Sequence, residues 1–222
     1  MTFRSIKNSE FKVEDVSIII TNYNYGRYLD RCIRSCLKQQ NASCQIVVVD
    51  DCSTDNTLEI IKPFVDDITF TKTKKNSGVA AASNLGIQHA RGRFIIRVDA
   101  DDYIHENTCY FLMRYLQMNR DAFCVSCDYY LVDDHENKLE RKYAQKDNIS
   151  CGVMYRKDLF RKLGCYNESM RHCEEEELRK RIGKFYKIHH LAMPFYRYRM
   201  HDSNKTKSPE YVKILKKVKA GK

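Results

Sequence analysis

No stretch of the sequence approaches the roughly 20 consecutive apolar residues that a membrane-spanning helix requires. The opening stretch, MTFRSIKNSEFKVEDVSIII, also lacks the order of basic, apolar and small-residue regions that defines a signal peptide. We therefore expect a cytoplasmic protein whose contact with a membrane, if any, is peripheral and at its inner face. The composition, 43% hydrophobic and 31% charged residues in a chain of 222, supports a folded core and excludes a disordered chain.

The sequence also lacks internal repeats, low-complexity linkers and a convincing set of zinc ligands. Cys124 and Cys127 form a CxxC pair, but no second pair and no histidines at zinc-finger spacing accompany it. Without an export signal, we expect the ten cysteines to be reduced thiols that behave mostly as small buried hydrophobic residues.

Positive charge is abundant, and it is unevenly distributed. The net charge is +10, and the segment HDSNKTKSPEYVKILKKVKAGK alone carries seven lysines against two acids. Such a segment suits an anionic membrane surface or a nucleic acid, and a solvated terminus is an equal alternative. No nucleic-acid-binding motif accompanies it, so nucleic acid is the weaker of the two charged partners.

Apolar runs alternate with helical patterns through the first half of the chain. The expected strands are VSIII (16–20), QIVVVDD (45–51), ITFTKT (68–73) and RFIIRV (93–98). After the first of them, Leu29, Cys32, Ile33, Cys36 and Leu37 recur at the spacing of one buried helical face. Strands and helices that alternate with short connections predict an α/β fold, a mainly parallel sheet flanked by helices on both faces.

The second half departs from this alternation. We expect a helix at about 107–120, an antiparallel strand pair at 122–134 and 138–144, an acidic helix start at 173–182 and a strand at 185–201. We read residues 1–204 as one domain, with a ligand-binding half at about 14–104 and a half at about 105–204 that completes the site. Residues 205–222 form the basic C-terminal tail.

Polar side chains gather where the predicted parallel strands end. In such sheets ligands bind beyond the carboxyl ends of the strands, so these residues should share one rim. They are Thr21, Asn22, Tyr23 and Asn24 after the first strand, Asp50 and Asp51 after the second, Asn76 and Gly78 after the third, and Asp99, Asp101 and Asp102 after the fourth.

Three carboxylates in four positions suggest a site for a divalent cation. Asp99, Asp101 and Asp102 follow a buried strand, and Mg²⁺ or Mn²⁺ binds carboxylate oxygens while sharing phosphate oxygens of a ligand. The alternative is an acidic turn that caps the following helix. A nucleotide needs further partners, such as a ring that stacks on the base and an acid that accepts from base or ribose. Tyr23 and Asp51 are candidates, although either could serve packing or capping alone.

Four blocks of the sequence, in order, resemble the family 2 glycosyltransferases of the GT-A fold. They are VSIIITNYNYGRYLDRCIRSCLKQ, QIVVVDDCSTDNTLEII, NSGVAAASNLGIQHARGRFIIRVDADD and YRYRMH, and together they run from Val16 to His201. The resemblance implies an inverting enzyme that moves a sugar from a nucleotide-diphosphate donor, with a UDP-sugar favoured, to a hydroxyl of a glycan or lipid-linked acceptor. It also implies Mn²⁺ or Mg²⁺ as cofactor and a place in surface polysaccharide or glycolipid biosynthesis.

The resemblance also assigns roles to residues. Thr21, Tyr23 and Asp51 correspond to the nucleoside contacts. Asn84, in the helix expected within 77–92, is a separate candidate that the resemblance does not assign, and it could instead simply be exposed. The family's DxD motif corresponds to Asp99, which also neighbours the nucleotide, and Asp101, the expected direct metal ligand. Asp102 would help to hold the metal, and His201 matches a histidine that contacts metal or diphosphate in some members.

The catalytic base is harder to assign. In the family it is usually the Asp of a Glu-Asp pair that opens a helix and is followed by a leucine and an arginine. Aligning Leu178 and Arg181 of CEEEELRKR with these residues puts the pair at Glu174–Glu175, with Glu175 as the base. Glutamate moves the carboxylate by about 1 Å relative to aspartate, so the choice among Glu174, Glu175 and Glu176 stays open. The alternative is an acidic first turn that merely suits the helix macrodipole.

Two other functions compete with glycosyl transfer. A nucleotidyltransferase on a related sheet would make a nucleotide-sugar, but it usually has a glycine- and lysine-rich loop after the first strand. The corresponding stretch here, TNYNYGRY, is poor in both residues. The other alternative is a non-catalytic subunit that binds a nucleotide-sugar.

Overall fold

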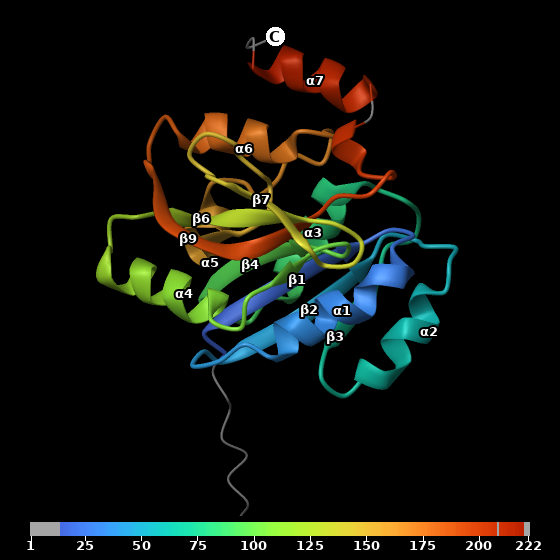
Figure 1. Ribbon diagram of the computed structural model, residues 1–222. Coiled ribbons are helices and arrows are strands. Elements are labelled where there is room, and N and C mark those ends of the chain that lie inside the picture. The colour runs from blue at the N-terminus through green and yellow to red at the C-terminus, as the bar shows by residue number, and fades with distance from the viewer. Residues whose placement is uncertain (1–13, 208, 220–222) are drawn as a thin grey trace, which may run out of the picture.

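The computed structural model describes residues 14–207 and 209–219, which fold around one nine-stranded sheet (Figure 1). The strand order is β3-β2-β1-β4-β8-β6-β9-β5, and β7 pairs with β6 outside this path. The first four of these strands are parallel to one another. The predicted α/β class, with a mainly parallel sheet flanked by helices, is confirmed.

The parallel part of the sheet consists of β1 (Val16–Asn22), β2 (Cys44–Asp50), β3 (Thr69–Lys72) and β4 (Phe94–Asp99). In the register of these strands, Thr21 lies opposite both Val49 and Asp99. The carboxyl ends of β1, β2 and β4 are therefore level, and the polar residues that follow them meet at one edge of the sheet.

The second half of the chain adds the remaining strands. They are β5 (Tyr103–Ile104), β6 (Cys124–Val132), β7 (Lys138–Lys142), β8 (Val153–Arg156) and β9 (Ile188–Arg199). β8 joins β4 in antiparallel fashion, and the predicted antiparallel pair is confirmed as β6 and β7. β5 pairs with the C-terminal part of β9. It was not predicted, because a strand of two residues is too short to show a periodic pattern.

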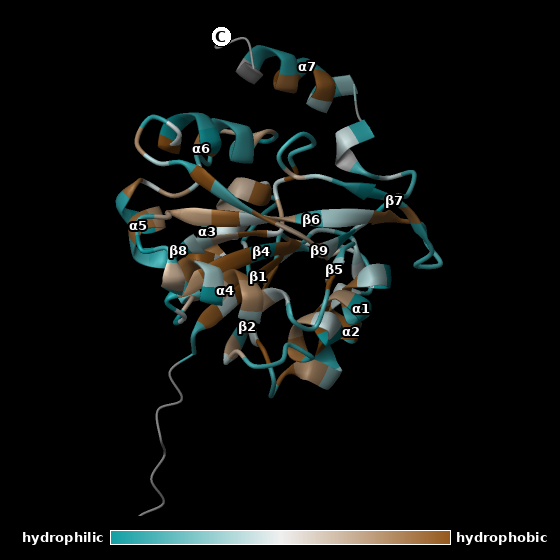
Figure 2. Cartoon of the chain, turned by 60° about the vertical axis from the view of Figure 1, so that its left-hand side comes forward, coloured by the Kyte–Doolittle hydropathy of each residue, from teal (hydrophilic) through white to brown (hydrophobic). Residues whose placement is uncertain are grey.

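Two hydrophobic cores form, one on each face of the sheet, because successive side chains of a strand point to opposite faces. Ile18 and Ile20 of β1 belong to one core, and Ile19 belongs to the other. Figure 2 shows hydrophobic residues concentrated in the central strands and hydrophilic residues on outer helices such as α6. The helices are α1 (Gly26–Leu37), α2 (Thr57–Ile61), α3 (Val79–His89), α4 (Thr108–Met118), α5 (Lys157–Lys162), α6 (Glu174–Ile182) and α7 (Pro209–Lys219), with short 3-10 turns η1 (Lys62–Phe64) and η2 (Lys205–Lys207).

The helical face predicted for α1 is buried except at its end. Leu29, Cys32, Ile33 and Cys36 are fully buried, whereas Leu37 is 37% exposed because the helix stops there.

All ten cysteines are free thiols, and seven of them are buried. Burial raises the pKa of the Cys32 thiol well above its usual value, which keeps this group in its neutral form.

The segment predicted as a basic tail has structure of its own. After β9 the chain forms η2 and then α7, which packs on α6 at the top of Figure 1. The division at residue 204 stays a prediction, and residues 1–13, 208 and 220–222 of the predicted parts lie outside the described residues. Within the described ranges, none of the helices combines the length and apolar character needed to cross a membrane.

Candidate active site

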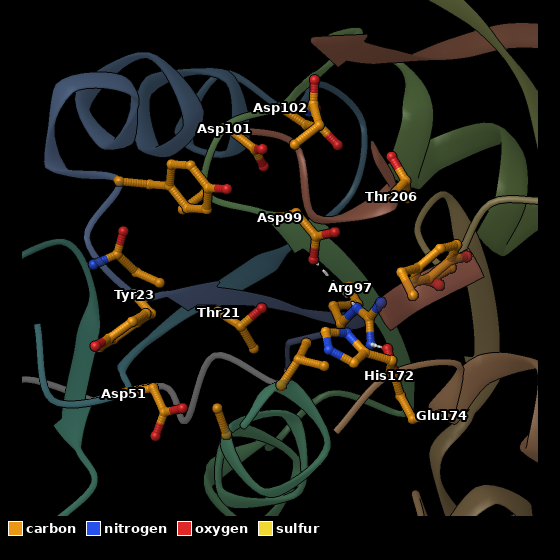
Figure 3. Close-up of a pocket in the computed structure, with 18 of the residues that line it drawn as sticks. Thr21, Tyr23, Asp51, Arg97, Asp99, Asp101, Asp102, His172, Glu174 and Thr206 are labelled. Atoms are coloured by element: carbon orange, nitrogen blue, oxygen red, sulfur yellow. Dashed lines mark hydrogen bonds and ion pairs between the residues drawn. The ribbon is translucent and has the colours of Figure 1, made fainter. Parts of the chain in front are cut away.

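A pocket opens at the edge of the sheet where β1, β2 and β4 end (Figure 3). Figure 3 shows Tyr23 and Asp51 on one side of the pocket, Asp99 near its middle, and His172 and Glu174 on the other side. The residues that line it are Thr21, Asn22, Tyr23, Tyr25, Asp51, Val79, Ala82, Arg97, Asp99, Ala100, Asp101, Asp102, Ser150, Arg171, His172, Cys173, Glu174, Tyr198, Asn204, Thr206 and Tyr211.

The predicted nucleoside contacts lie together on one wall. Thr21 stands at the end of β1, and Asp51 directly follows β2. The Asp51 carboxylate accepts hydrogen bonds from the Thr73 hydroxyl (2.7 Å) and from the backbone N–H groups of Ser77 (2.9 Å) and Gly78 (2.8 Å). These donors fix the carboxylate at the pocket wall while leaving it lone pairs for a ligand.

Asn84, a predicted nucleotide contact, is placed elsewhere. Its side chain donates to the Tyr166 carbonyl (2.9 Å) and the Glu168 carboxylate (2.9 Å), and it accepts from the Tyr166 backbone N–H (3.1 Å). The residue is 7% exposed and is not among those that line the pocket. The Asn84 side chain thus stabilises the loop after α5, because its NH₂ group and its carbonyl oxygen are both hydrogen-bonded to that loop.

The three carboxylates of the acidic turn converge as predicted. Asp99, Asp101 and Asp102 each bring an oxygen to within 4.8 Å of the others. Asp102 is 2% exposed and accepts from the Tyr196 hydroxyl (2.7 Å) and the Arg199 backbone N–H (2.8 Å). Burial, and then the neighbouring carboxylates of Asp101 and Asp99, raise the pKa of Asp102 well above its usual range.

His201 stands behind this turn. Its Nε2 atom lies 2.9 Å from a carboxylate oxygen of Asp101, and its Nδ1 atom lies 2.9 Å from the Ser203 hydroxyl. His201 does not line the pocket itself, but it contacts Asp101, which does. The ring of Tyr25 packs edge-on against it at a centroid distance of 5.6 Å, and the Tyr25 hydroxyl donates to the Ser203 carbonyl (3.0 Å).

The residues of the turn fit a divalent cation. One buried oxygen of Asp99 lacks a hydrogen-bond partner among the described residues, and it forms an ion pair with Arg97 Nε at 3.4 Å. Carboxylate oxygens with an imidazole nitrogen nearby form a donor set that suits Mn²⁺ or Mg²⁺. A cation bound by these acids would also offset their mutual repulsion.

Arg97 is a central residue of the site that the sequence reading missed. It lies in β4, it is 6% exposed, and its guanidinium donates to Glu174 Oε1 at 2.8 Å while facing Asp99. Burial lowers its pKa, but the acidic neighbours Cys151, Asp99 and Glu174 outweigh burial and leave the pKa well above its usual value. The available signal was a charge inside the apolar run FIIRV, since a buried charge requires a partner.

The acidic helix start presents one of its glutamates to the pocket, and that residue is Glu174. Glu175, the predicted base, is 1% exposed and accepts hydrogen bonds from the hydroxyls of Tyr155 and Tyr166 and from Arg179 Nε (3.2 Å). Neighbouring helical positions point about 100° apart, and here Glu174 lines the pocket whereas Glu175 does not. The placement of Glu175 therefore differs from the expectation, because the phase of α6 turns it toward the core.

The other two glutamates of the run have partners on α6 and α7. Glu177 pairs with Arg181 one turn later at 2.9 Å. Glu176 is partly buried, and burial followed by the charges of Glu174 and Glu175 raises its pKa. Neither residue lines the pocket.

The wall opposite the predicted nucleoside contacts comes largely from the C-terminal part of the chain. Arg171 and His172 precede α6, and Thr206 and Tyr211 come from η2 and α7. The ring of Tyr211 stands edge-on to the ring of His172 at a centroid distance of 6.1 Å, and Glu210 lies 3.8 Å from His172 Nε2. Part of the segment predicted as a tail thus completes the pocket, which lysine content alone did not indicate.

Comparison with known proteins gives consistent matches. The family model described as "Glycosyl transferase family 2" matches residues 17–193. Glycosyltransferase GlyG of Streptococcus pneumoniae serotype 4 is 36% identical over 129 residues, which are 57% of this chain and 42% of GlyG. The chain therefore spans less than half the length of this curated relative.

Solved structures show the same fold. S. aureus TarS 1–349 in complex with UDP superposes with a TM-score of 0.74 at 21% identity, over 93% of this chain and 64% of that one. Mannosyltransferase PcManGT from Pyrobaculum calidifontis, in complex with GDP-Man and Mn²⁺, gives a TM-score of 0.68 at 17% identity, over 86% of this chain and 58% of that one. The likeness in fold supports the GT-A architecture that the sequence blocks implied.

Proposed function

Because the chain belongs to glycosyl transferase family 2, we propose that it transfers a sugar from a nucleotide-diphosphate donor to a hydroxyl group of an acceptor, with inversion at the anomeric carbon. The single observation that carries this proposal is the pocket. It combines a nucleoside wall around Asp51, an acidic turn at Asp99 and Asp101, and a carboxylate on the opposite side, that of Glu174. An inverting transferase needs the nucleotide and the cation on one side of the bond between the sugar C1 and the diphosphate, and the base on the opposite side.

UDP is the nucleotide that we favour for the donor. Tyr23 would stack on the base, Asp51 would accept from a base N–H or the ribose, and Thr21 would contact the nucleoside from the end of β1. The UDP in the TarS crystal structure supports this choice, and the GDP-Man in PcManGT keeps a GDP-sugar as the competing donor.

The acidic turn would hold the cofactor, Mn²⁺ or Mg²⁺. Asp101 and Asp99 would bind it, Asp102 would fix the turn and help, and His201 would orient Asp101 from behind. When bound, the cation would neutralise the charge that develops on the departing diphosphate.

Glu174 is the base in this proposal. Its carboxylate takes the proton of the acceptor hydroxyl as that oxygen forms a bond to C1 of the sugar. The C1–O bond to the diphosphate breaks on the opposite face, so the configuration at C1 inverts. Arg97 donates to Glu174 Oε1 at 2.8 Å and thereby holds the carboxylate at the pocket wall.

Nucleotide binding tests the proposal. With UDP and Mn²⁺ at about 100 times the dissociation constant, stabilisation should reach about 2.7 kcal/mol, or roughly 5–10 °C in Tm for a domain of this size. UDP without Mn²⁺ should give a smaller shift, and adenosine diphosphate is the control nucleotide. No shift with UDP or GDP, with or without Mn²⁺, would contradict the proposal. Release of diphosphate from a nucleoside triphosphate and a sugar phosphate would instead identify a nucleotidyltransferase.

The acceptor that we propose is a glycan or a lipid-linked saccharide of surface polysaccharide or glycolipid synthesis, met at the inner membrane face. The outward side of α7 supports peripheral contact with anionic lipid. Lys213, Lys216 and Lys217 are exposed there, whereas Tyr211 and Ile214 are partly buried on the other side.

Vesicle binding tests this membrane contact. Replacing the three lysines by glutamine should weaken binding to phosphatidylglycerol vesicles by about 100-fold, at about 1 kcal/mol for each lysine near the surface. Phosphatidylcholine vesicles are the control, and raised salt should weaken the wild-type interaction in the same way. Equal binding of variant and wild type at low salt would rule the contact out.

A further inference from the structure

The pocket wall formed by Arg171, His172 and Tyr211, here called the C-terminal wall, contains a cation without a partner. Arg171 is exposed, it lines the pocket, and it makes no hydrogen bond or ion pair within residues 14–207 and 209–219. It lies three residues before Glu174, the proposed base. A guanidinium group presents five N–H donors in one plane, a geometry that fits a carboxylate or a phosphate.

The other arginine of the pocket is not available for such a ligand. Arg97 is buried and already faces Glu174 at 2.8 Å and Asp99 at 3.4 Å. On the opposite wall, Asp51 and the acidic turn carry negative charge and would repel an anion that has no cation of its own. In the described pocket lining, Arg171 is therefore the charge that a second anion would meet.

Tyr211 adds a flat apolar surface to the same wall. Its ring is positioned by the edge-on contact with His172, and its hydroxyl is hydrogen-bonded to Glu176 of α6. Burial, and then the charge of Glu176, raise the pKa of Tyr211 well above its usual value, so the ring stays a neutral phenol. A neutral aromatic ring with its polar tip engaged offers its remaining surface to the apolar face of a ligand.

We propose that the C-terminal wall recognises an acidic acceptor, a saccharide that carries a carboxylate or a phosphate next to its reactive sugar. This inference rests on the proposed function and names the acceptor class for the same pocket. Arg171 binds the anionic group, Tyr211 packs against the sugar ring, and the hydroxyl between them is presented to Glu174. The two anions, donor diphosphate and acceptor acid, are then bound at opposite walls by different positive charges.

Binding to the protein loaded with Mn²⁺ and UDP tests the inference by calorimetry. The probes are a tetrasaccharide of alternating glucuronic acid and N-acetylglucosamine, a glycerol phosphate tetramer, and the neutral tetramer of N-acetylglucosamine. At least one acidic probe should bind about tenfold or more tightly than the neutral one, and the probe that does so identifies carboxylate or phosphate as the anion. Arg171→Gln should remove this preference, and Arg171→Lys should keep part of it.

Two further variants separate the parts of the wall. Tyr211→Ala should weaken acidic and neutral probes alike, because it removes ring contact without changing charge. Lys184→Gln, the same loss of charge at an exposed position outside the pocket lining, should change neither affinity nor preference. The affinity for UDP with Mn²⁺ should be the same in all of these proteins.

Several outcomes would overturn the inference. They are equal binding of neutral and acidic probes, no binding of any probe, or an acidic preference that survives in Arg171→Gln. Weaker UDP binding in Arg171→Gln with unchanged probe binding would show that Arg171 serves the donor diphosphate instead. A wild-type protein that does not bind UDP with Mn²⁺ at all would overturn the proposed function, which is a different result.

Discussion

Glu174→Gln is expected to lower the rate of sugar transfer by about 10²–10⁴-fold while leaving the affinity for UDP and Mn²⁺ unchanged. The amide cannot accept the acceptor proton, yet its oxygen can still accept the hydrogen bond from Arg97 that the carboxylate accepts at 2.8 Å. The substitution therefore removes the base with little change in the shape of the wall. Single-turnover transfer from the donor sugar, with nucleotide affinity measured in parallel, checks the prediction.

Glu175→Gln is the matched control, one residue along the same helix. This side chain is buried against Tyr155, Tyr166 and Arg179, so its neutralisation should lower the free energy of unfolding by about 1–3 kcal/mol. Transfer by the folded fraction should change far less than in Glu174→Gln. The reverse pattern, full transfer in Glu174→Gln and none in a stable Glu175→Gln protein, would return the base to the position that the sequence alignment favoured.

Asp101→Asn is expected to weaken Mn²⁺-dependent binding of UDP by at least about 100-fold. Loss of residues that merely support a metal ligand typically costs 10- to 100-fold in metal affinity, so loss of a ligand should cost no less. The fold should persist, because Asp101 is only partly buried and its carboxylate contacts the His201 ring at 2.9 Å. Titration of UDP at several Mn²⁺ concentrations measures the effect.

Asp202→Asn provides the control for Asp101→Asn. Asp202 is exposed, it lies outside the pocket lining, and its replacement removes the same charge a few residues from the site. It should leave Mn²⁺-dependent binding within about twofold, since an exposed charge is well screened. If Asp101→Asn binds UDP with the wild-type dependence on Mn²⁺, the acidic turn is a structural cap and the cation belongs elsewhere.

The first half of the fold could be predicted from the sequence, because each strand is marked by a local apolar run and this pattern repeats along the chain. Continuous apolar runs marked β1, β2 and β4, and the polar residues that follow them meet at one rim, since parallel strands end on the same side of a sheet. Asp51 and the turn from Asp99 to Asp102 were found in this way. Their placement at the pocket depends on strand register, which the apolar pattern constrains strongly.

The parts that were missed depend on contacts between distant segments. The rotation of α6 about its own axis, as it packs on the core, decides whether Glu174 or Glu175 faces the pocket. A run of four identical glutamates gives no information on that rotation. Arg97 looked like an irregularity in an apolar strand until Glu174, 77 residues later in the chain, supplied its partner. Lysine content predicted a basic tail at residues 205–222, but it could not show that Tyr211 lies in the pocket wall.

In the proposed complex, the hydrogen bonds that hold Asp51 would affect the free energy of nucleotide binding. Thr73, Ser77 and Gly78 fix this carboxylate in the protein without a ligand, so the proposed contact with the nucleoside would form without ordering a mobile side chain. Ordering a flexible side chain on binding typically costs about 0.5–1.5 kcal/mol, and here that cost has already been met during folding. A rigid hydrogen-bond acceptor would also add specificity. It would favour a nucleoside whose N–H or O–H group is oriented toward the fixed carboxylate oxygen.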